Sequence, residues 1–476
     1  MRGLYSPLTF AVVAVLVVAL LLASPNAMLW AAVALAFPII VWVLGGTRAY
    51  PVLVWLIGIS WLQIAGDVLG ADLNDHVLGD GWMGQYRERA VYFSLSAMLA
   101  MALGMRCGTR LGAWAFGSGA HASAFWLGEN GPDVRLRRVV TAYFATLVLT
   151  EVAGATANAV PTLAQPILAL ALLKFVCVYL AASTVFASDR GYQWLILISL
   201  FELTIGIGGF FAGYKEAFFV IFVALAASRG AVSLRKWLFA ATAVTIVIWV
   251  SLVWTVIKTE YRYEIFGNPL EQRVAWFAQR IAVNPIDYND AALRLVQRIG
   301  YTEFYARLMA RLDTGAIPRN LGLYGAAVQH VLTPRVLFPD KLALDDSKLT
   351  TALLGFKIGD DTSIGVGYVA EAHVDFEFPG MLVPLLMLGA MLGGAAQYFM
   401  TRRAPLCIRE GFATASLFLS FSFAANIDKA LGGFITGFLV MAMALKFGYP
   451  IIAQWLAGGR SYPRADQDRA PAGMPI

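Results

Sequence analysis

Charged residues are scarce in this chain, since Lys, Arg, Asp and Glu make up 14% of its 476 residues. Ordinary globular domains contain about 25% charged and about 45–50% apolar residues, whereas hydrophobic residues reach 59% here. This composition excludes a string of soluble domains. Runs of roughly 17–22 apolar residues recur, each long enough to cross a hydrocarbon core of ~30 Å as a helix. The chain is therefore predicted to be an all-α polytopic integral membrane protein.

Cysteine and histidine are also rare, with three and four residues respectively. Cys107, Cys177 and Cys407 all lie outside the one long polar segment, so no disulfide is expected there. No Cys or His residues have the spacing of a metal site, and no arginine-rich motif accompanies the net charge of +6. The sequence thus predicts no metal, no cofactor and no nucleic-acid partner.

Hydropathy predicts about twelve membrane spans. They fall at about 8–24, 28–45, 51–68, 90–106, 138–158, 164–187, 192–211, 213–228, 237–257, 379–400, 411–426 and 431–449. The first span shows no small-residue cleavage site, so we expect it to be retained. Four regions follow: spans one to nine (1–257), a large loop (258–378), spans ten to twelve (379–457) and a disordered tail (458–476).

The basic residues of the short loops predict the orientation. One set of loops is rich in them, with Arg48, Arg106, Arg110, Arg135, Arg137, Arg138, Arg190, Arg229, Arg235, Lys236, Arg402, Arg403, Arg409 and the tail arginines. The opposite short loops carry only Arg87, Arg89, Lys215 and Lys429. Because positive charge marks the cytoplasmic side, both termini are expected in the cytoplasm and residues 258–378 on the far side. No tandem repeat is visible, which counts against a two-halved transporter.

Three ionisable residues are predicted at membrane depth: Glu151, Lys174 and Glu202. Such residues are functional-site candidates, but a buried pair of Lys174 with either acid explains them equally simply. The glycine-rich turn Gly206–Gly213 precedes Lys215 and Glu216. Glycine permits close approach of a ligand, so Lys215 is a candidate anion ligand, with a membrane-anchoring lysine as the alternative.

The large loop is predicted to contain amphipathic helices that present arginines. Leu270, Val274, Phe277 and Ile281 repeat with helical spacing, and a second helix is expected from the Asn289-Asp290 cap to about residue 312. Arg280, Arg294 and Arg298 are the arginines of these helices that we assign to anion binding. Pairing with nearby carboxylates or lipid headgroups is the competing interpretation for each of them.

The end of the loop combines cations with acids. Arg335 and Lys341 lie close together in a segment whose backbone is restricted by Pro334 and Pro339. The acid–base candidates Asp361, Glu371, His373 and Asp375 follow. Glycosyl transfer from a lipid diphosphate needs this combination, because cations stabilise the departing diphosphate and a base accepts the hydroxyl proton. Glu371 is the first choice of base because Asp375 lies one helical turn away and would raise the pKa of one of the two. A purely structural Glu371 is the alternative, and Asp361, His373, Asp375 and His330 are the other candidates.

Two motifs carry a resemblance to a known family. They are Pro334-Arg-Val-Leu-Phe-Pro-Asp-Lys341 and Thr362-Ser-Ile-Gly-x-Gly-x-x-x-Glu-x-x-x-Asp-Phe-x-x-x-Gly380. With the spans before a big outer loop, they resemble bacterial O-antigen and exopolysaccharide repeat-unit polymerases of the Wzy type. This family often places an arginine near the position of Lys215.

The resemblance implies a GT-C-like enzyme of the bacterial inner membrane that works on the periplasmic face. It would transfer a growing glycan from undecaprenyl diphosphate to the next lipid-linked repeat unit, without metal or cofactor. Its expected partners are the lipid-linked oligosaccharide, membrane lipids and a chain-length regulator. An O-antigen ligase that uses the same donor is one alternative, and a transporter or flippase of a lipid-linked sugar is another.

Overall fold

The computed structural model describes residues 24–46, 49–117, 136–208, 214–228, 233–283, 285–333, 337–338, 341, 346–357, 365–402, 404–418 and 423–449. Every regular element in these ranges is helical. Seven helical segments are long and apolar enough to cross a membrane: Pro51–Leu73, Gly84–Phe116, Leu136–Ala159, Pro161–Ser188, Leu234–Glu264, Leu382–Met400 and Ile427–Gly448. The predicted all-α membrane class is thereby confirmed.

The number of spans stays a prediction beyond these seven. The predicted span at 8–24 lies outside the described residues. Three others coincide with shorter helices, namely α2 (Ala27–Val43), α8 (Tyr192–Gly208) and α9 (Tyr214–Ala227). The predicted span at 411–426 begins inside α18, which covers only Leu406–Leu417.

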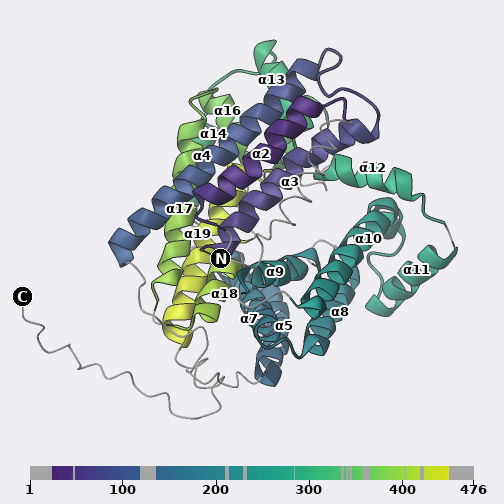
Figure 1. Cartoon of the computed structure of the whole chain (residues 1–476), viewed down its shortest axis with the longest axis vertical. Coiled ribbons are helices and arrows are strands. Elements are labelled where there is room, and N and C mark those ends of the chain that lie inside the picture. The colour runs from purple at the N-terminus through teal and green to yellow at the C-terminus, as the bar shows by residue number, and fades with distance from the viewer. Residues whose placement is uncertain are drawn as a thin grey trace, which may run out of the picture.

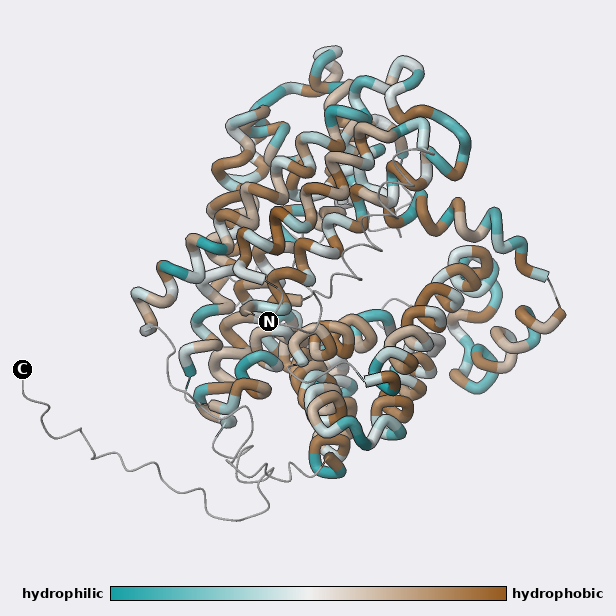
Figure 2. Tube along the Cα trace, in the orientation of Figure 1, coloured by the Kyte–Doolittle hydropathy of each residue, from teal (hydrophilic) through white to brown (hydrophobic). Residues whose placement is uncertain are grey.

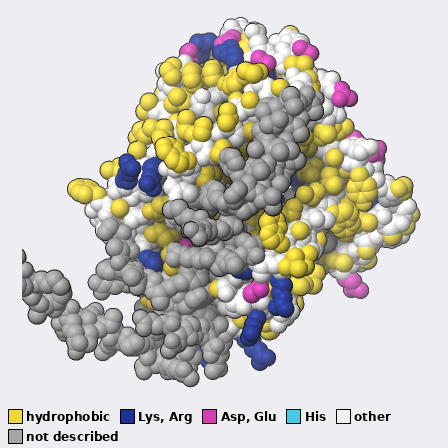
Figure 3. All heavy atoms as spheres, in the orientation of Figure 1, with side chains coloured by type: hydrophobic (Ala, Val, Ile, Leu, Met, Phe, Trp, Pro, Cys, Tyr) yellow, Lys and Arg dark blue, Asp and Glu magenta, His cyan; other side chains and the backbone are white. Residues whose placement is uncertain are grey.

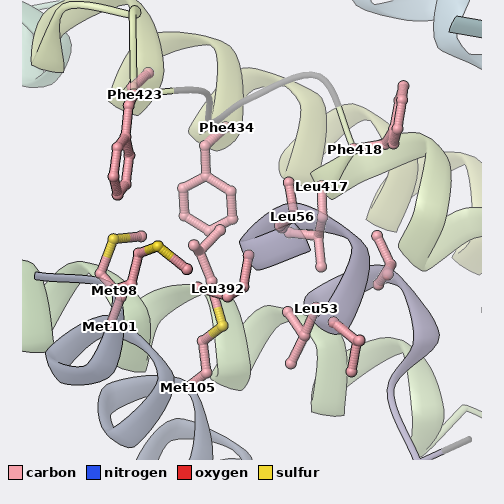
Figure 4. Close-up of a cluster of buried hydrophobic side chains, with 14 of the residues drawn as sticks. Leu53, Leu56, Met98, Met101, Met105, Leu392, Leu417, Phe418, Phe423 and Phe434 are labelled. Atoms are coloured by element: carbon pink, nitrogen blue, oxygen red, sulfur yellow. The ribbon is translucent and has the colours of Figure 1, made fainter. Parts of the chain in front are cut away.

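The larger core joins helices from both ends of the chain. In Figure 1, α2, α3 (Pro51–Leu73), α4 (Gly84–Phe116) and α17 (Leu382–Met400) run side by side, with α19 (Ile427–Met443) next to them. Figure 4 shows leucines of α3, methionines of α4 and Phe434 of α19 in one apolar cluster, together with Phe418 and Phe423, which lie between α18 and α19. The helices α5 (Leu136–Ala159), α6 (Ala164–Ala169) and α7 (Leu173–Ser188) extend this core.

Glycines bring α4 and α17 into backbone contact. Gly104 and Gly108 of α4 and Gly389 and Gly393 of α17 are each four residues apart. A Cβ atom on any of them would lie closer than 3.0 Å to a main-chain oxygen of the partner helix. Small residues at this spacing are the usual means of close helix packing in membranes, where lipid gives no hydrophobic incentive for association.

A smaller, separate core lies at the other side of the molecule. It consists of Phe218 of α9, Phe277 of α11 (Leu270–Val283) and the aromatic and branched residues along α10 (Leu234–Glu264). The remainder of α9 packs into the larger core through Val220 and Ile221. Helix α9 therefore connects the two cores.

The long polar segment differs from the prediction at two points. Helix α10 continues to Glu264, so the loop begins later than residue 258. The single helix predicted for 289–312 is wrong, because the chain forms α12 (Tyr288–Ile299) and α13 (Thr302–Asp313) with Gly300 extended between them. The cause is the carboxylate of Asp67, which accepts the Tyr301 and Thr302 N–H groups at 2.8 and 2.7 Å and so starts a new helix.

Three more short helices follow: α14 (Leu323–Leu332), α15 (Asp346–Leu354) and α16 (Tyr368–Phe376).

Charged side chains concentrate at the ends of the bundle. Figure 2 shows hydrophobic helices in the middle of the molecule, and on the face in Figure 3 the charged side chains lie around the outline, at the upper end, the lower edge and both sides. Arg87 and Arg89 at the start of α4 pair with Glu303 and Asp313 of α13 at 2.7 and 3.1 Å. The start of α4 and the polar segment therefore lie at the same end, as the arginine distribution predicts.

A candidate anion-binding site

Two of the three ionisable residues predicted at membrane depth, Lys174 and Glu202, form an ion pair. The Lys174 ammonium lies 3.0 Å from Glu202, whose other oxygen accepts the Tyr143 hydroxyl at 2.8 Å. Glu202 is 1% exposed. The predicted pairing of Lys174 is thus with Glu202, whereas Glu151 is exposed on α5. Removing one partner of a buried pair leaves an uncompensated charge, so replacing either Lys174 or Glu202 alone is expected to destabilise the bundle.

Four cations on α9, α10 and α12 are linked through their charges, and α10 packs against both other helices. Lys215 of α9 lies within electrostatic range of Arg298 of α12. The charges of Arg298 and Arg262 in turn act on Lys258, and both Lys258 and Arg262 belong to the last turns of α10. Three of these side chains are exposed and Lys258 is half-buried. We call Lys215, Lys258, Arg262 and Arg298 the cation cluster.

Like charges that share one place repel each other, and an anion that binds between them relieves the repulsion. Arginine makes two-point contacts to phosphate, and lysine acts as a compact point charge. Two residues of each kind suit an anion with several oxygens, such as a diphosphate.

The position of Arg298 follows from the packing of α12 on α3. Gly66 and Gly70 of α3 face Ile299 and Val296, and a Cβ atom at Gly70 would lie 3.2 Å from the Val296 side chain. At Gly300 a Cβ atom would collide with the Asp67 carboxylate. Close packing and the two hydrogen bonds to Asp67 therefore fix the end of α12 at Ile299, the residue after Arg298.

Asp67→Ala is expected to destabilise the protein by about 1–3 kcal/mol, because two N–H groups at the start of α13 lose their acceptor. Asp67→Asn keeps an acceptor oxygen and should restore most of the loss. The midpoint of thermal unfolding in detergent measures both variants. Equal midpoints for Asp67→Ala and the wild type would refute the role of Asp67.

The other cations assigned to anion binding lie elsewhere. Arg280 binds Glu260 through two hydrogen bonds of 2.6 and 3.1 Å. Arg294 pairs with Asp290 at 2.7 Å on the exposed side of α12. Lys341 donates to the main-chain oxygen of His330, and Arg335 lies outside the described residues. Of the predicted set, the structure brings together Arg298 and Lys215.

Three of the predicted acid–base residues, Glu371, His373 and Asp375, lie on the helix α16. Glu371 is 1% exposed and accepts the Ile427 N–H at 2.7 Å, at the start of α19. Asp375 accepts the Tyr324 N–H at 2.8 Å, at the start of α14. Carboxylates stabilise helix N-termini by accepting these N–H groups. Both side chains thus join α16 to other helices, while Asp361 lies outside the described residues.

His373 lies on another side of α16, between aromatic rings. Its ring stacks on Phe93 at 5.7 Å and meets Tyr305 edge-on at 5.5 Å. Burial, together with the charge of Arg89, lowers the pKa of His373 to about 4, so its imidazole is neutral at pH 7. Its Nδ1 is buried and has no hydrogen-bond partner among the described residues.

Two members of the cation cluster, Lys258 and Arg262, were not predicted from the sequence as site residues. Lys258 and Arg262 stand at the boundary between an apolar run and the polar loop, where cations are typical of a membrane interface. Their spacing of four residues places them on one face of a helix. This spacing was the feature of the sequence that could have identified them as site residues. It was missed because the helix was predicted to end at 257, although α10 continues to Glu264.

No protein-family model matches the chain, and neither a curated protein nor a solved structure is significantly similar to it.

Proposed function

We propose that this chain is a membrane glycosyltransferase that polymerises oligosaccharide repeat units carried on a polyprenyl diphosphate. The observation that carries the proposal is the cation cluster, formed by the membrane helix α10, the short helix α9 and the amphipathic helix α12. The phosphates of a lipid-linked diphosphate lie at the membrane surface. At this level the apolar helices end and the polar segment begins. Cations at that level hold the donor and stabilise the diphosphate as it leaves.

The motif resemblance of the polar segment supports the same reaction. In the proposed reaction, a hydroxyl of one repeat unit attacks the anomeric carbon of the donor glycan. The bond from that carbon to the diphosphate oxygen breaks, and the lipid diphosphate departs with the electron pair. The proton of the attacking hydroxyl passes to a general base and from there to water. The proposal places this reaction on the periplasmic face of a bacterial inner membrane, following the orientation predicted from the short loops.

A reconstituted system tests the proposal directly. The purified chain in liposomes is given polyprenyl-diphosphate-linked repeat units isolated from the host, and the products are separated by gel electrophoresis. We expect a ladder of longer glycans and one released lipid diphosphate for each bond formed. Unaltered repeat units that merely cross the bilayer would identify a transporter instead. Glycan that appears only after lipid A core is added would identify a ligase.

A further inference from the structure

Two arginines of α13, Arg307 and Arg311, lie against the turn that follows α15. They are four residues apart, so they project from the same side of the helix. The Arg307 guanidinium lies 5.2 Å from the centre of the Phe356 ring. A Cβ atom on Gly355 would collide with the Arg311 guanidinium, which therefore lies directly on the bare backbone of that glycine. Because these two neighbours are consecutive residues, the two guanidinium groups lie beside each other.

Arg311 is half-buried and lacks an acid partner. Within the described ranges it forms no ion pair, and its buried Nε has no hydrogen-bond partner there. The carboxylate two residues later, Asp313, binds Arg89 and Arg319 instead, at 3.1 Å each. A buried donor without an acceptor costs free energy. An anion bound at this place would supply the missing acceptor.

Arg307 is only weakly engaged. The Glu303 carboxylate lies 3.6 Å away, beyond the length of a hydrogen bond, and its other oxygen binds Arg87 at 2.7 Å. Phe356 packs on Phe304 of α13, with ring centroids 6.5 Å apart. This aromatic pair holds the turn after α15 against α13, and with it both guanidinium groups.

The arginine pair lies at the end of the bundle that carries the polar segment. Helix α13 packs against α4, and Figure 1 shows it at the upper end of the molecule, away from the helices α9 and α10 of the cation cluster. In the proposed function, the cation cluster holds the diphosphate and the glycan extends outward from it. The arginine pair is then placed to meet sugars of the repeat unit.

We propose that Arg307 and Arg311 bind the carboxylate of an acidic sugar, such as a hexuronic acid, in the repeat unit. A guanidinium donates two parallel hydrogen bonds to a carboxylate. Arg311 supplies this two-point contact, and Arg307 adds a second positive charge. This inference rests on the proposed function and names the class of its substrate, a glycan with acidic repeat units.

Methyl β-glucuronide and methyl β-glucoside test the site directly, because they differ only in a carboxylate that replaces a hydroxymethyl group. Saturation-transfer NMR with the purified protein in detergent should detect binding of the glucuronide and not of the glucoside. Arg311→Gln is expected to weaken glucuronide binding by about 10–100-fold, the usual effect of losing a hydrogen bond to a charged group. Arg294→Gln, in the exposed pair of α12, is the control and should bind like the wild type.

Two glycine variants test the geometry without removing a charge. Gly355 and Gly315 have positive φ angles of 76° and 69°, so alanine strains both turns alike. A methyl group on Gly355 would displace the Arg311 guanidinium, whereas one on Gly315 would meet nothing within 4 Å. Gly355→Ala should therefore lose glucuronide binding and Gly315→Ala should keep it, with similar thermal unfolding midpoints.

The possible outcomes separate this inference from the proposed function. Equal binding of the two glycosides would overturn the inference, and so would wild-type affinity in Arg311→Gln. Binding of glycerol phosphate without binding of the glucuronide would also overturn it, because the site would then recognise a phosphate. Glucuronide binding requires no donor, so a protein that binds it but forms no polymer would support the site and refute the proposed function. A protein that polymerises but does not bind the glucuronide would refute this inference alone.

Discussion

Replacing Arg298 by alanine is expected to lower the rate of polymer formation by about 10²–10³-fold, the usual loss when one donor to a developing negative charge is removed. Arg298 is the member of the cation cluster that interacts with both Lys215 and Lys258. It is also the member whose helix is fixed by α3 and Asp67. Arg298→Lys should recover only part of the rate, because an ammonium cannot copy the two-point contact of a guanidinium with phosphate.

The same helix provides a matched control for this prediction. Arg294 lies one turn before Arg298, but its guanidinium pairs with Asp290 and is 61% exposed. Surface pairs of this kind contribute only about 0–1 kcal/mol, so Arg294→Ala should polymerise at the wild-type rate. Initial rates with reconstituted protein at equal amounts measure both variants. Equal losses from the two substitutions would show that Arg298 acts through the stability of α12 and not through the donor.

Gly393→Ala is expected to destabilise the protein by about 1–3 kcal/mol or more, because the added methyl group overpacks a closed interface. The methyl carbon would collide with the main-chain oxygen of Met105. A flexible side chain could move away, but a main-chain oxygen inside a helix cannot do so without shifting α4 as a whole. Loss of this contact should reduce the amount of protein in the membrane.

The neighbouring residue serves as the control, because a Cβ atom on Gly394 would lie 3.8 Å from the nearest atom, an ordinary contact. Gly394→Ala should be neutral or slightly stabilising, since alanine favours a helix over glycine by about 1 kcal/mol. Thermal unfolding midpoints in one detergent compare the two variants. Similar midpoints would mean that α4 and α17 separate easily, contrary to the close packing described above.

Composition and hydropathy were sufficient to predict the class of this fold. A long run of apolar residues indicates a helix that crosses the membrane, and the seven long helices coincide with such runs. The pairing of Lys174 was also predictable, because a charge at membrane depth requires a partner. Which partner it takes depends on how α7 and α8 pack, and the sequence alone left Glu151 and Glu202 as equal choices.

The candidate site was predicted less completely, for a physical reason. Arginines at helical spacing on α11 and α12 look alike in sequence. In the structure Arg280 pairs with Glu260 and Arg294 pairs with Asp290, whereas the charge of Arg298 acts on Lys215 and Lys258. The packing that holds the end of α12 likewise involves a carboxylate more than two hundred residues earlier in the chain, which local spacing does not reveal. Glu371 and Asp375 were likewise predicted as candidate acid–base residues. Local spacing could not show that they contact the first turns of α19 and α14.

The pair of Lys174 and Glu202 has a consequence for how the chain enters the membrane. Each charge alone at the centre of a span opposes insertion by about 2.5–3.5 kcal/mol. The two residues lie on helices that follow one another directly, joined by the short segment from Asp189 to Gly191. During synthesis, α7 and α8 can therefore enter lipid as one hairpin in which the ammonium and the carboxylate already face each other. Insertion of α7 should then depend on the synthesis of α8, and a chain truncated after Gly191 should leave α7 poorly inserted.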